Sequence, residues 1–127
     1  MMKEIVMSSM APKPIGPYSQ GVVSGNYIFL SGQVGRKHDA TELEKGVAAQ
    51  TRQTILNIKA VLAKKNLNLD NVVKTSVFLA DMNDFAEMNG VYSEFFDENT
   101  APARTTIQAA ALPLAADVEI EAMASLD

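Results

Sequence analysis

The sequence predicts an α+β fold in which two helices cover one face of a mixed, mostly antiparallel sheet. Stretches rich in β-branched and aromatic residues, which favour strands, occur in both halves of the chain. Two longer stretches between them carry apolar residues at the spacing of an amphipathic helix. The chain has 127 residues and no linker rich in Pro, Gly or Ser. We therefore expect a single domain over residues 1–127.

The N-terminal part is expected to form a hairpin. Residues 27–30 are β-branched, aromatic or aliphatic, and Gly25-Asn26 before them is typical of a tight turn after residues 20–24. The hairpin ends at residues 31–33. A short strand over residues 4–7 comes before it.

The first helix is predicted between residues 43 and 65, where apolar residues recur at helical spacing. Thr41 and Glu44 have the spacing of a capping box at its start. Gly46 is a poor helix former, so the position of the first turn stays open.

The second half of the chain alternates strand and helix. Residues 72–80 predict a strand, and the apolar positions from Phe85 to Phe96 predict a second amphipathic helix. Two strands follow, over residues 104–109 and 118–124, joined through Pro113. The predicted order is thus ββαβαββ with an additional short first strand.

Composition excludes several classes of function. The chain has no cysteine, which excludes thiolate metal sites and a thiol nucleophile and is typical of an intracellular protein. Its one histidine, His38, lies in a charged stretch that indicates a solvated loop, and a single imidazole is too few for the common zinc sites. The net charge of −4 disfavours nucleic acids, and the longest apolar run, residues 109–116, is too short to span a membrane. We expect a soluble, cytoplasmic protein.

Polar candidates for a functional site collect on the last two predicted strands. Side chains alternate along a strand, so Ile107 and Ala109 lie on one face and the polar residues of that strand on the other. In the last strand, Val118, Ile120, Ala122 and Ala124 share one face. If the aliphatic sets of both strands pack under the helices, the uncovered face carries the polar sets. These are Arg104, Thr106, Gln108, Glu119 and Glu121.

Arg104 and Glu119 have two interpretations. They can form a cross-strand ion pair on a wetted sheet face, which contributes little to stability and needs no function. Alternatively, Arg104 binds a substrate carboxylate through two parallel hydrogen bonds and Glu119 orients or deprotonates a water molecule. The second interpretation requires a pocket that excludes bulk water, and a second subunit covering the sheet would provide it.

Two further residues are ambiguous from pattern alone. Tyr18 lies in the turn-rich segment 15–20, either as a packing residue or as a hydroxyl group aimed into a site. Asn89 is either a surface amide of the second helix or part of the same site.

Five motifs occur in order along the chain: Ile15-Gly16-Pro17-Tyr18-Ser19-Gln20-Gly21, Ser31-Gly32-Gln33, Asn83-Asp84-Phe85 to Asn89, Pro102-Ala103-Arg104 and Val118-Glu119-Ile120-Glu121-Ala122. Together they closely resemble the RidA family, also called YjgF/YER057c/UK114. The resemblance runs from about Ile5 to the C-terminus.

The resemblance implies a fold of the Bacillus chorismate mutase type, assembled as a homotrimer whose sheets form a central barrel with pockets between subunits. Family members most similar to this sequence hydrolyse enamines and imines of the 2-aminoacrylate and 2-iminobutanoate type to 2-oxo acids and ammonia, without metal or cofactor. By resemblance, Arg104 grips the substrate carboxylate and Glu119 positions the attacking water. The remaining pocket positions implied are Tyr18, Thr106, Ser31, Gly32 and Asn89.

Two departures from the family pattern and two rival functions accompany this expectation. Thr106 stands where many active members have cysteine, although its backbone N–H remains available to a carboxylate. Residues 97–101 look slightly shorter than in the best-known bacterial members, and a loop at a pocket mouth affects substrate size. One rival is a regulatory protein that binds small carboxylates without turnover. The other is an endoribonuclease or translation inhibitor, which the acidic charge disfavours.

Overall fold

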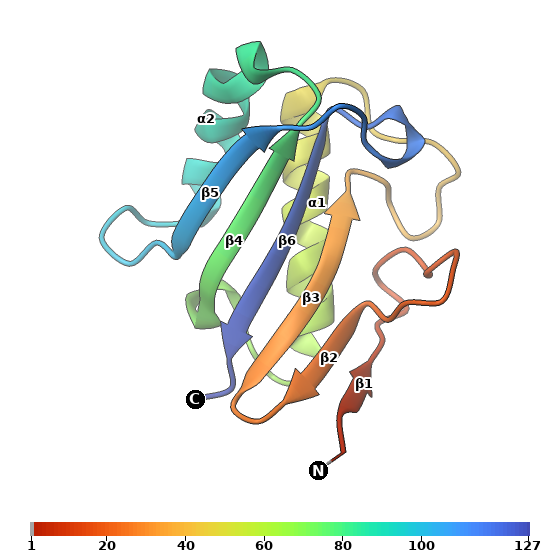
Figure 1. The fold of residues 1–127 in the computed structure, drawn as a ribbon, viewed down its shortest axis with the longest axis vertical. Helices are drawn as coiled ribbons and strands as arrows, with labels where there is room; N and C mark the ends of the chain where they lie inside the picture. Colours follow the sequence, from red (N-terminus) through yellow and green to blue (C-terminus); the bar gives the residue numbers. More distant parts are fainter. Residues whose placement is uncertain (1) are drawn as a thin grey trace.

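The computed structural model describes residues 2–127. The elements follow one another as β1 (Glu4–Val6), β2 (Gly21–Ser24), β3 (Tyr27–Val34), α1 (Val47–Ala63), β4 (Val72–Leu79), α2 (Phe85–Phe95), β5 (Ala103–Gln108) and β6 (Val118–Ser125) (Figure 1). Short 3₁₀ turns cover Leu69–Asn71, Met82–Asp84 and Pro113–Ala115. The predicted order of strands and helices is confirmed, including the short first strand.

The strands form one sheet in the order β1-β2-β3-β6-β4-β5. Among these strands, β4 and β5 pair in parallel and the other neighbours are antiparallel. α1 connects β3 to β4 and α2 connects β4 to β5, and both connections move toward the same edge of the sheet. Because such crossovers are right-handed, both helices lie on the same face. Figure 1 shows α1 and α2 behind the sheet, with the opposite face uncovered.

The core lies between the sheet and the two helices. Alternate residues of the central strands point into it, and the helices contribute the residues that face them. Burial of each such aliphatic side chain stabilises the fold by roughly 1.5–3 kcal/mol. The most deeply buried members are Ile28, Ile55, Ile58, Val61, Leu62, Val77, Leu79, Met88, Val118, Ile120 and Ala124. The prediction that the aliphatic residues of the last strand pack under the helices is thereby confirmed.

α1 begins at Val47, four residues later than the sequence pattern indicated. Gly46 precedes it with a φ of 88°, in the left-handed region that favours glycine. The chain therefore enters the helix only after this residue, and the predicted capping box is wrong. The backbone N–H of Glu44 donates instead to the carbonyl of Gly35 at 2.8 Å.

The open face of the sheet carries large apolar side chains that solvent reaches. Phe29 on β3 is 45% exposed and Ile107 on β5 is 48% exposed. A shallow hollow of about 200 Å³ on this face is lined by residues that include Phe29, Lys74 and Glu121. Exposed apolar side chains gathered on one face are typical of a surface that another chain covers.

Within residues 2–127, none of the helices combines the length and the apolar character that crossing a bilayer requires.

Candidate functional site

The predicted site residues fall into two groups on opposite faces of the sheet. Val118 and Ile120 are buried in the core, so Glu119 between them points to the open face. Arg104 pairs in register with Thr75, whose hydroxyl contacts Tyr92 of α2, so Arg104 points to the helix face. Within one chain, the predicted site residues therefore form two separate groups.

Glu119 sits beside a bulge of β3. The register between β3 and β6 shifts between Leu30 and Gln33, and Ser31 and Gly32 form the irregular part. A methyl group on Gly32 would lie 2.5 Å from Oε2 of Glu119, which is closer than carbon and oxygen can approach. Glycine at this position leaves the room that the carboxylate occupies.

Ser31 ties this bulge to the segment that carries Tyr18. Its hydroxyl donates to the carbonyl of Ser19, and its backbone N–H donates to the carbonyl of Gln20 at 3.0 Å. The buried side-chain amide of Gln20 in turn accepts from the N–H of Ser8 at 2.6 Å and donates to the carbonyl of Pro12 at 2.9 Å. These bonds fix the loop before β2 next to Glu119.

Tyr18, Gly32 and Glu119 line one hollow of about 90 Å³, which we call the Glu119 hollow. Tyr18 is 51% exposed and is therefore not a core residue. Lys13 and Arg36 also line the hollow, although sequence reasoning did not single them out. No spacing rule marks them, because both lie in loops that only the fold brings to β6.

Strained backbone borders the Glu119 hollow. Leu114 and Ala115 have φ values of 59° and 55°, which is uncommon for residues other than glycine. Such conformations cost on the order of 1–3 kcal/mol each and cluster at functional sites. Leu114 is 52% exposed and lines the hollow. The sequence indicated only a connection through Pro113 here.

The carboxyl group of Glu119 is more basic than an ordinary glutamate. Burial raises its pKa above the usual value of 4.5, and the charge of Glu121 raises the pKa further. A carboxylate with a raised pKa is a better proton acceptor near neutral pH.

Arg104 is held against α2. Its Nη1 donates to Oδ1 of Asn89 at 2.7 Å. The guanidinium carbon lies 4.7 Å from the centre of the Tyr92 ring and 5.6 Å from that of Phe85. We call Asn89, Arg104 and Thr106, with these two rings, the Arg104 cluster. The two ring contacts use none of the guanidinium N–H donors, so donors other than the one bonded to Asn89 remain for a ligand.

Tyr92 links the Arg104 cluster to the middle of the sheet. Its hydroxyl group and that of Thr75 on β4 share a hydrogen bond of 2.8 Å. Burial raises the pKa of Tyr92, while the bond to Thr75 and the charge of Arg104 lower it in part. The ring therefore stays neutral at physiological pH and holds Arg104 through its π face.

Thr106 lies on the same face as Arg104, two residues further along β5. Its hydroxyl oxygen is buried and has no hydrogen-bond partner among residues 2–127. A ligand that supplies the missing hydrogen bond therefore binds more favourably.

The prediction that Arg104 lies on the open face of the sheet is wrong, and so is the interpretation of Arg104 and Glu119 as a cross-strand ion pair. Arg104, Thr106 and Gln108 share a face as expected, but that face is covered by α2, and Ile107 lies on the open face. β5 is an edge strand that pairs with β4, so β4 separates it from β6 and from Glu119. The assumption that the aliphatic residues of β5 pack under the helices fails because the open face also carries apolar side chains, among them Phe29 and Ile107.

His38 lies exposed in a turn after β3, as predicted. In the described part of the chain, residues 2–127, no three His, Cys, Asp or Glu side chains converge on a position suited to a metal ion.

The two halves offer complementary chemistry. The Arg104 cluster presents a fixed cation with free donors, and the Glu119 hollow presents a carboxylate that accepts a proton. Within one chain the sheet lies between them, so a small molecule cannot contact both.

Comparison with known proteins gives close relatives along nearly the whole chain. A RutC family protein of Pyrococcus horikoshii is 47% identical over 124 residues, which cover 97% of this chain and 98% of the relative. The 2-iminobutanoate/2-iminopropanoate deaminase of Escherichia coli K12 is 43% identical over 125 residues, which cover 97% and 98%. The crystal structure of Escherichia coli TdcF with bound serine matches with a TM-score of 0.90 at 40% identity, covering 96% of this chain and 98% of that one.

The family model of endoribonuclease L-PSP matches residues 8–126, a range that includes the Glu119 hollow and the Arg104 cluster. With this match and with relatives of such identity, the chain belongs to the endoribonuclease L-PSP family, which is the RidA family that its motifs resemble.

Proposed function

We propose that the protein hydrolyses small 2-imino and 2-enamino acids to 2-oxo acids and ammonia, in pockets that form between the subunits of a homotrimer. A relative at 43% identity is named as a deaminase of 2-iminobutanoate and 2-iminopropanoate, and another is described with bound serine. The position of Arg104 and Glu119 on opposite faces of one sheet carries the rest of the proposal.

Arg104 binds the substrate carboxylate in this proposal. Asn89 and the two aromatic rings restrict the movement of the guanidinium, so little side-chain freedom is lost when two parallel hydrogen bonds to a carboxylate form. The unpartnered hydroxyl of Thr106 lies on the same face and supplies a further polar contact. A single cation suits a small monocarboxylate.

Glu119 activates water in this proposal. The carboxylate accepts a proton while the water oxygen bonds to C2 of the protonated imine, and the raised pKa of Glu119 favours this transfer. Glu119 returns this proton to the nitrogen of the resulting carbinolamine. The C–N bond then breaks while the hydroxyl oxygen forms the C=O bond and gives up its proton, so a 2-oxo acid and ammonia, as ammonium, are released. An enamine first gains a proton at C3 to become the imine. Tyr18, Ser31 and Gly32 form the wall beside the water.

A second copy of the chain completes the site. The exposed apolar side chains of the open face have to be covered, and closed rotational symmetry brings the open face of one chain to the edge of the next. The Glu119 hollow of one subunit then meets the Arg104 cluster of its neighbour. Both halves face one substrate, and the neighbour excludes bulk water.

The test is an assay that generates the substrate in place. A serine or threonine dehydratase releases the enamine, and the appearance of 2-oxo acid is timed with and without this protein. We expect a clear acceleration that does not change when chelator is added. If the protein binds 2-oxobutyrate without any acceleration, it is a carboxylate-binding protein, and salt-sensitive cleavage of RNA would favour an endoribonuclease.

A further inference from the structure

A basic groove runs over the helix side of the molecule. Two adjoining hollows of about 470 and 520 Å³ share His38 in their lining. Residues 7–13, residues 37–39 and the outer surface of α1 and its C-terminal end form the walls. We call this surface the His38 groove. α1 lies behind the sheet in Figure 1, so the groove stays accessible when the open face is covered.

The charge of the His38 groove is opposite to that of the chain. Lys13, Lys37, Lys59 and Lys64 line it, with Asp39 as the acidic residue of the lining. The whole chain has 15 acidic and 11 basic residues. Nζ of Lys37 lies 4.0 Å from Oε1 of Glu44 and forms an ion pair with it. Lys59 and Lys64 take part in none of the ion pairs among residues 2–127. The groove is therefore a positive region on an acidic protein.

Apolar side chains accompany these lysines. Met7 and Met10 are 52% and 60% exposed, and Leu56 on α1 is 39% exposed. Methionine adapts its shape to different apolar partners, which makes it common at binding surfaces. A small inorganic anion would use neither these contacts nor the length of two joined hollows. An extended peptide with both acidic and apolar side chains uses all of them.

We propose that the His38 groove docks an acidic segment of a partner protein in which apolar side chains alternate with carboxylates. The carboxylates lie against Lys59, Lys64 and the His38 loop, and the apolar side chains cover Leu56 and the two methionines. The inference goes beyond the proposed reaction and does not depend on it.

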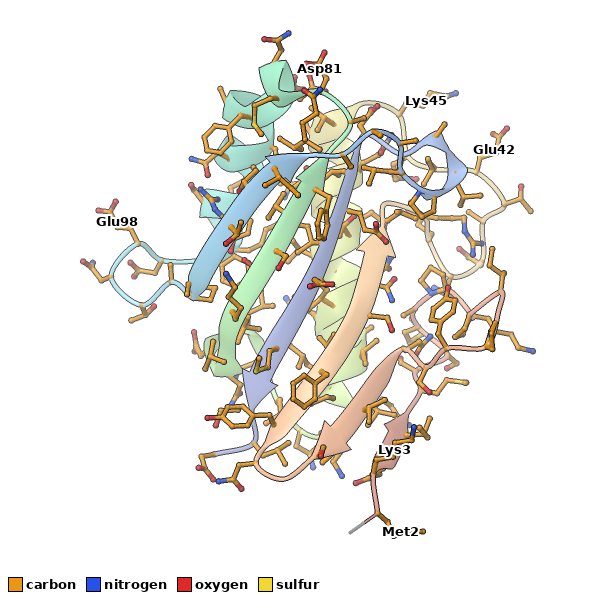
Figure 2. All side chains as sticks on the ribbon, in the orientation of Figure 1. Met2, Lys3, Glu42, Lys45, Asp81 and Glu98 are labelled. Atoms are coloured by element: carbon orange, nitrogen blue, oxygen red, sulfur yellow. The ribbon has the colours of Figure 1, made fainter. Side chains whose placement is uncertain are left out.

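The probe is a short fluorescein-labelled peptide of repeating Glu-Glu-Leu, with binding followed by fluorescence anisotropy. The test variant carries Lys59→Glu and Lys64→Glu together. The control carries Lys3→Glu and Lys45→Glu, which change the net charge equally and lie outside the groove, beside β1 and in the loop before α1 (Figure 2). We expect about tenfold or greater loss of affinity in the test variant and less than about twofold in the control.

A second comparison tests the apolar contribution. A peptide of repeating Glu-Glu-Ser, and the variant Met10→Ser with Leu56→Ser, should each weaken binding severalfold. Circular dichroism checks that each variant is folded, and imine hydrolysis should be unchanged in the Lys59 and Lys64 variant. Equal losses in both charge variants, full competition by pyrophosphate, or equal affinity of the Ser peptide would each overturn the proposal.

Discussion

Arg104 is positioned before any ligand arrives. Oδ1 of Asn89 accepts a hydrogen bond from its Nη1, and the centre of the Tyr92 ring lies 4.7 Å from its guanidinium carbon. The hydroxyl of Tyr92 is itself held by Thr75 in the middle of the sheet. A planar group fixed in this way recognises a planar carboxylate by geometry as well as by charge.

Arg104→Lys is therefore expected to fail almost as badly as Arg104→Ala. An ammonium group offers a point charge and cannot make two parallel hydrogen bonds, and it loses the stacking on Tyr92 and Phe85. The loss should be roughly 2–4 kcal/mol, or about 30- to 1000-fold in kcat/KM. Calorimetry with 2-oxobutyrate should show a parallel loss of affinity. A lysine variant that binds as well as the wild type would refute the role given to Arg104.

Glu119→Gln should abolish most turnover while carboxylate binding remains, because an amide keeps the shape but cannot accept a proton from water. Glu121→Gln is the matched control on the same strand and should lose much less activity.

Since burial and Glu121 raise the pKa of Glu119, the activity of the wild type should fall with decreasing pH at values above 4.5. Removal of the Glu121 charge should move this fall to lower pH.

The same raised pKa predicts a pH-dependent difference in stability. A carboxyl group whose pKa is higher in the folded state loses its stabilising contribution as pH rises through that folded value. The free energy of unfolding of Glu119→Gln, relative to wild type, should therefore be larger at neutral pH than below pH 4.5. Urea titrations at the two pH values measure this, and a constant difference would contradict it.

At the scale of elements, the bulge in β3 decides the geometry around Glu119. Gly32→Ala would place a methyl group 2.5 Å from Oε2, and the carboxylate, as the end of a flexible side chain, can move away. We expect a folded protein with strongly reduced activity. Gly90→Ala is the control, because nothing lies within 4 Å of the added methyl group in α2. It should raise the free energy of unfolding by about 0.5–1 kcal/mol and leave activity intact.

The order of the elements could be predicted from sequence, because periodicity is a local property. Helix α2 and strands β4 and β6 lie where their apolar patterns indicate. The start of α1 could not, since the positive φ of Gly46 depends on the loop that leads into it. The facing of β5 could not either. On this edge strand the exposed face carries the apolar Ile107, so alternation in the sequence cannot tell which face the helices cover.

The candidate site could be predicted as a set of residues but not as an arrangement. Pattern and resemblance named Arg104 and Glu119, but the pattern placed them on one face of the sheet. The order β6-β4-β5 separates them, and this order is a long-range property of the sheet. The left-handed backbone at Leu114 and the loop position of Lys13 likewise depend on contacts between distant segments.

At the scale of the whole molecule, the open face is expected to mediate assembly. Phe29→Lys and Ile107→Lys each place a charge on this face, in side chains that are 45% and 48% exposed in the single chain. Light scattering should give the mass of a trimer for the wild type and a smaller mass for these variants, with activity lost in parallel. Leu56→Lys, on the outer side of α1, is the control and should remain assembled. A monomeric wild type at micromolar concentration would contradict the composite site.

In the proposed trimer, the separation of Arg104 from Glu119 by the thickness of one sheet predicts that two defective chains repair each other. A subunit with Arg104→Ala still has its Glu119 hollow, and a subunit with Glu119→Gln still has its Arg104 cluster. Each variant alone should be inactive, but when the two are unfolded together and refolded as a mixture, about a quarter of the sites should pair the two intact halves. Complementation of this kind is impossible if both groups serve a site within one chain. Coexpression of the two variants in one cell should likewise restore part of the activity that neither gene supplies alone.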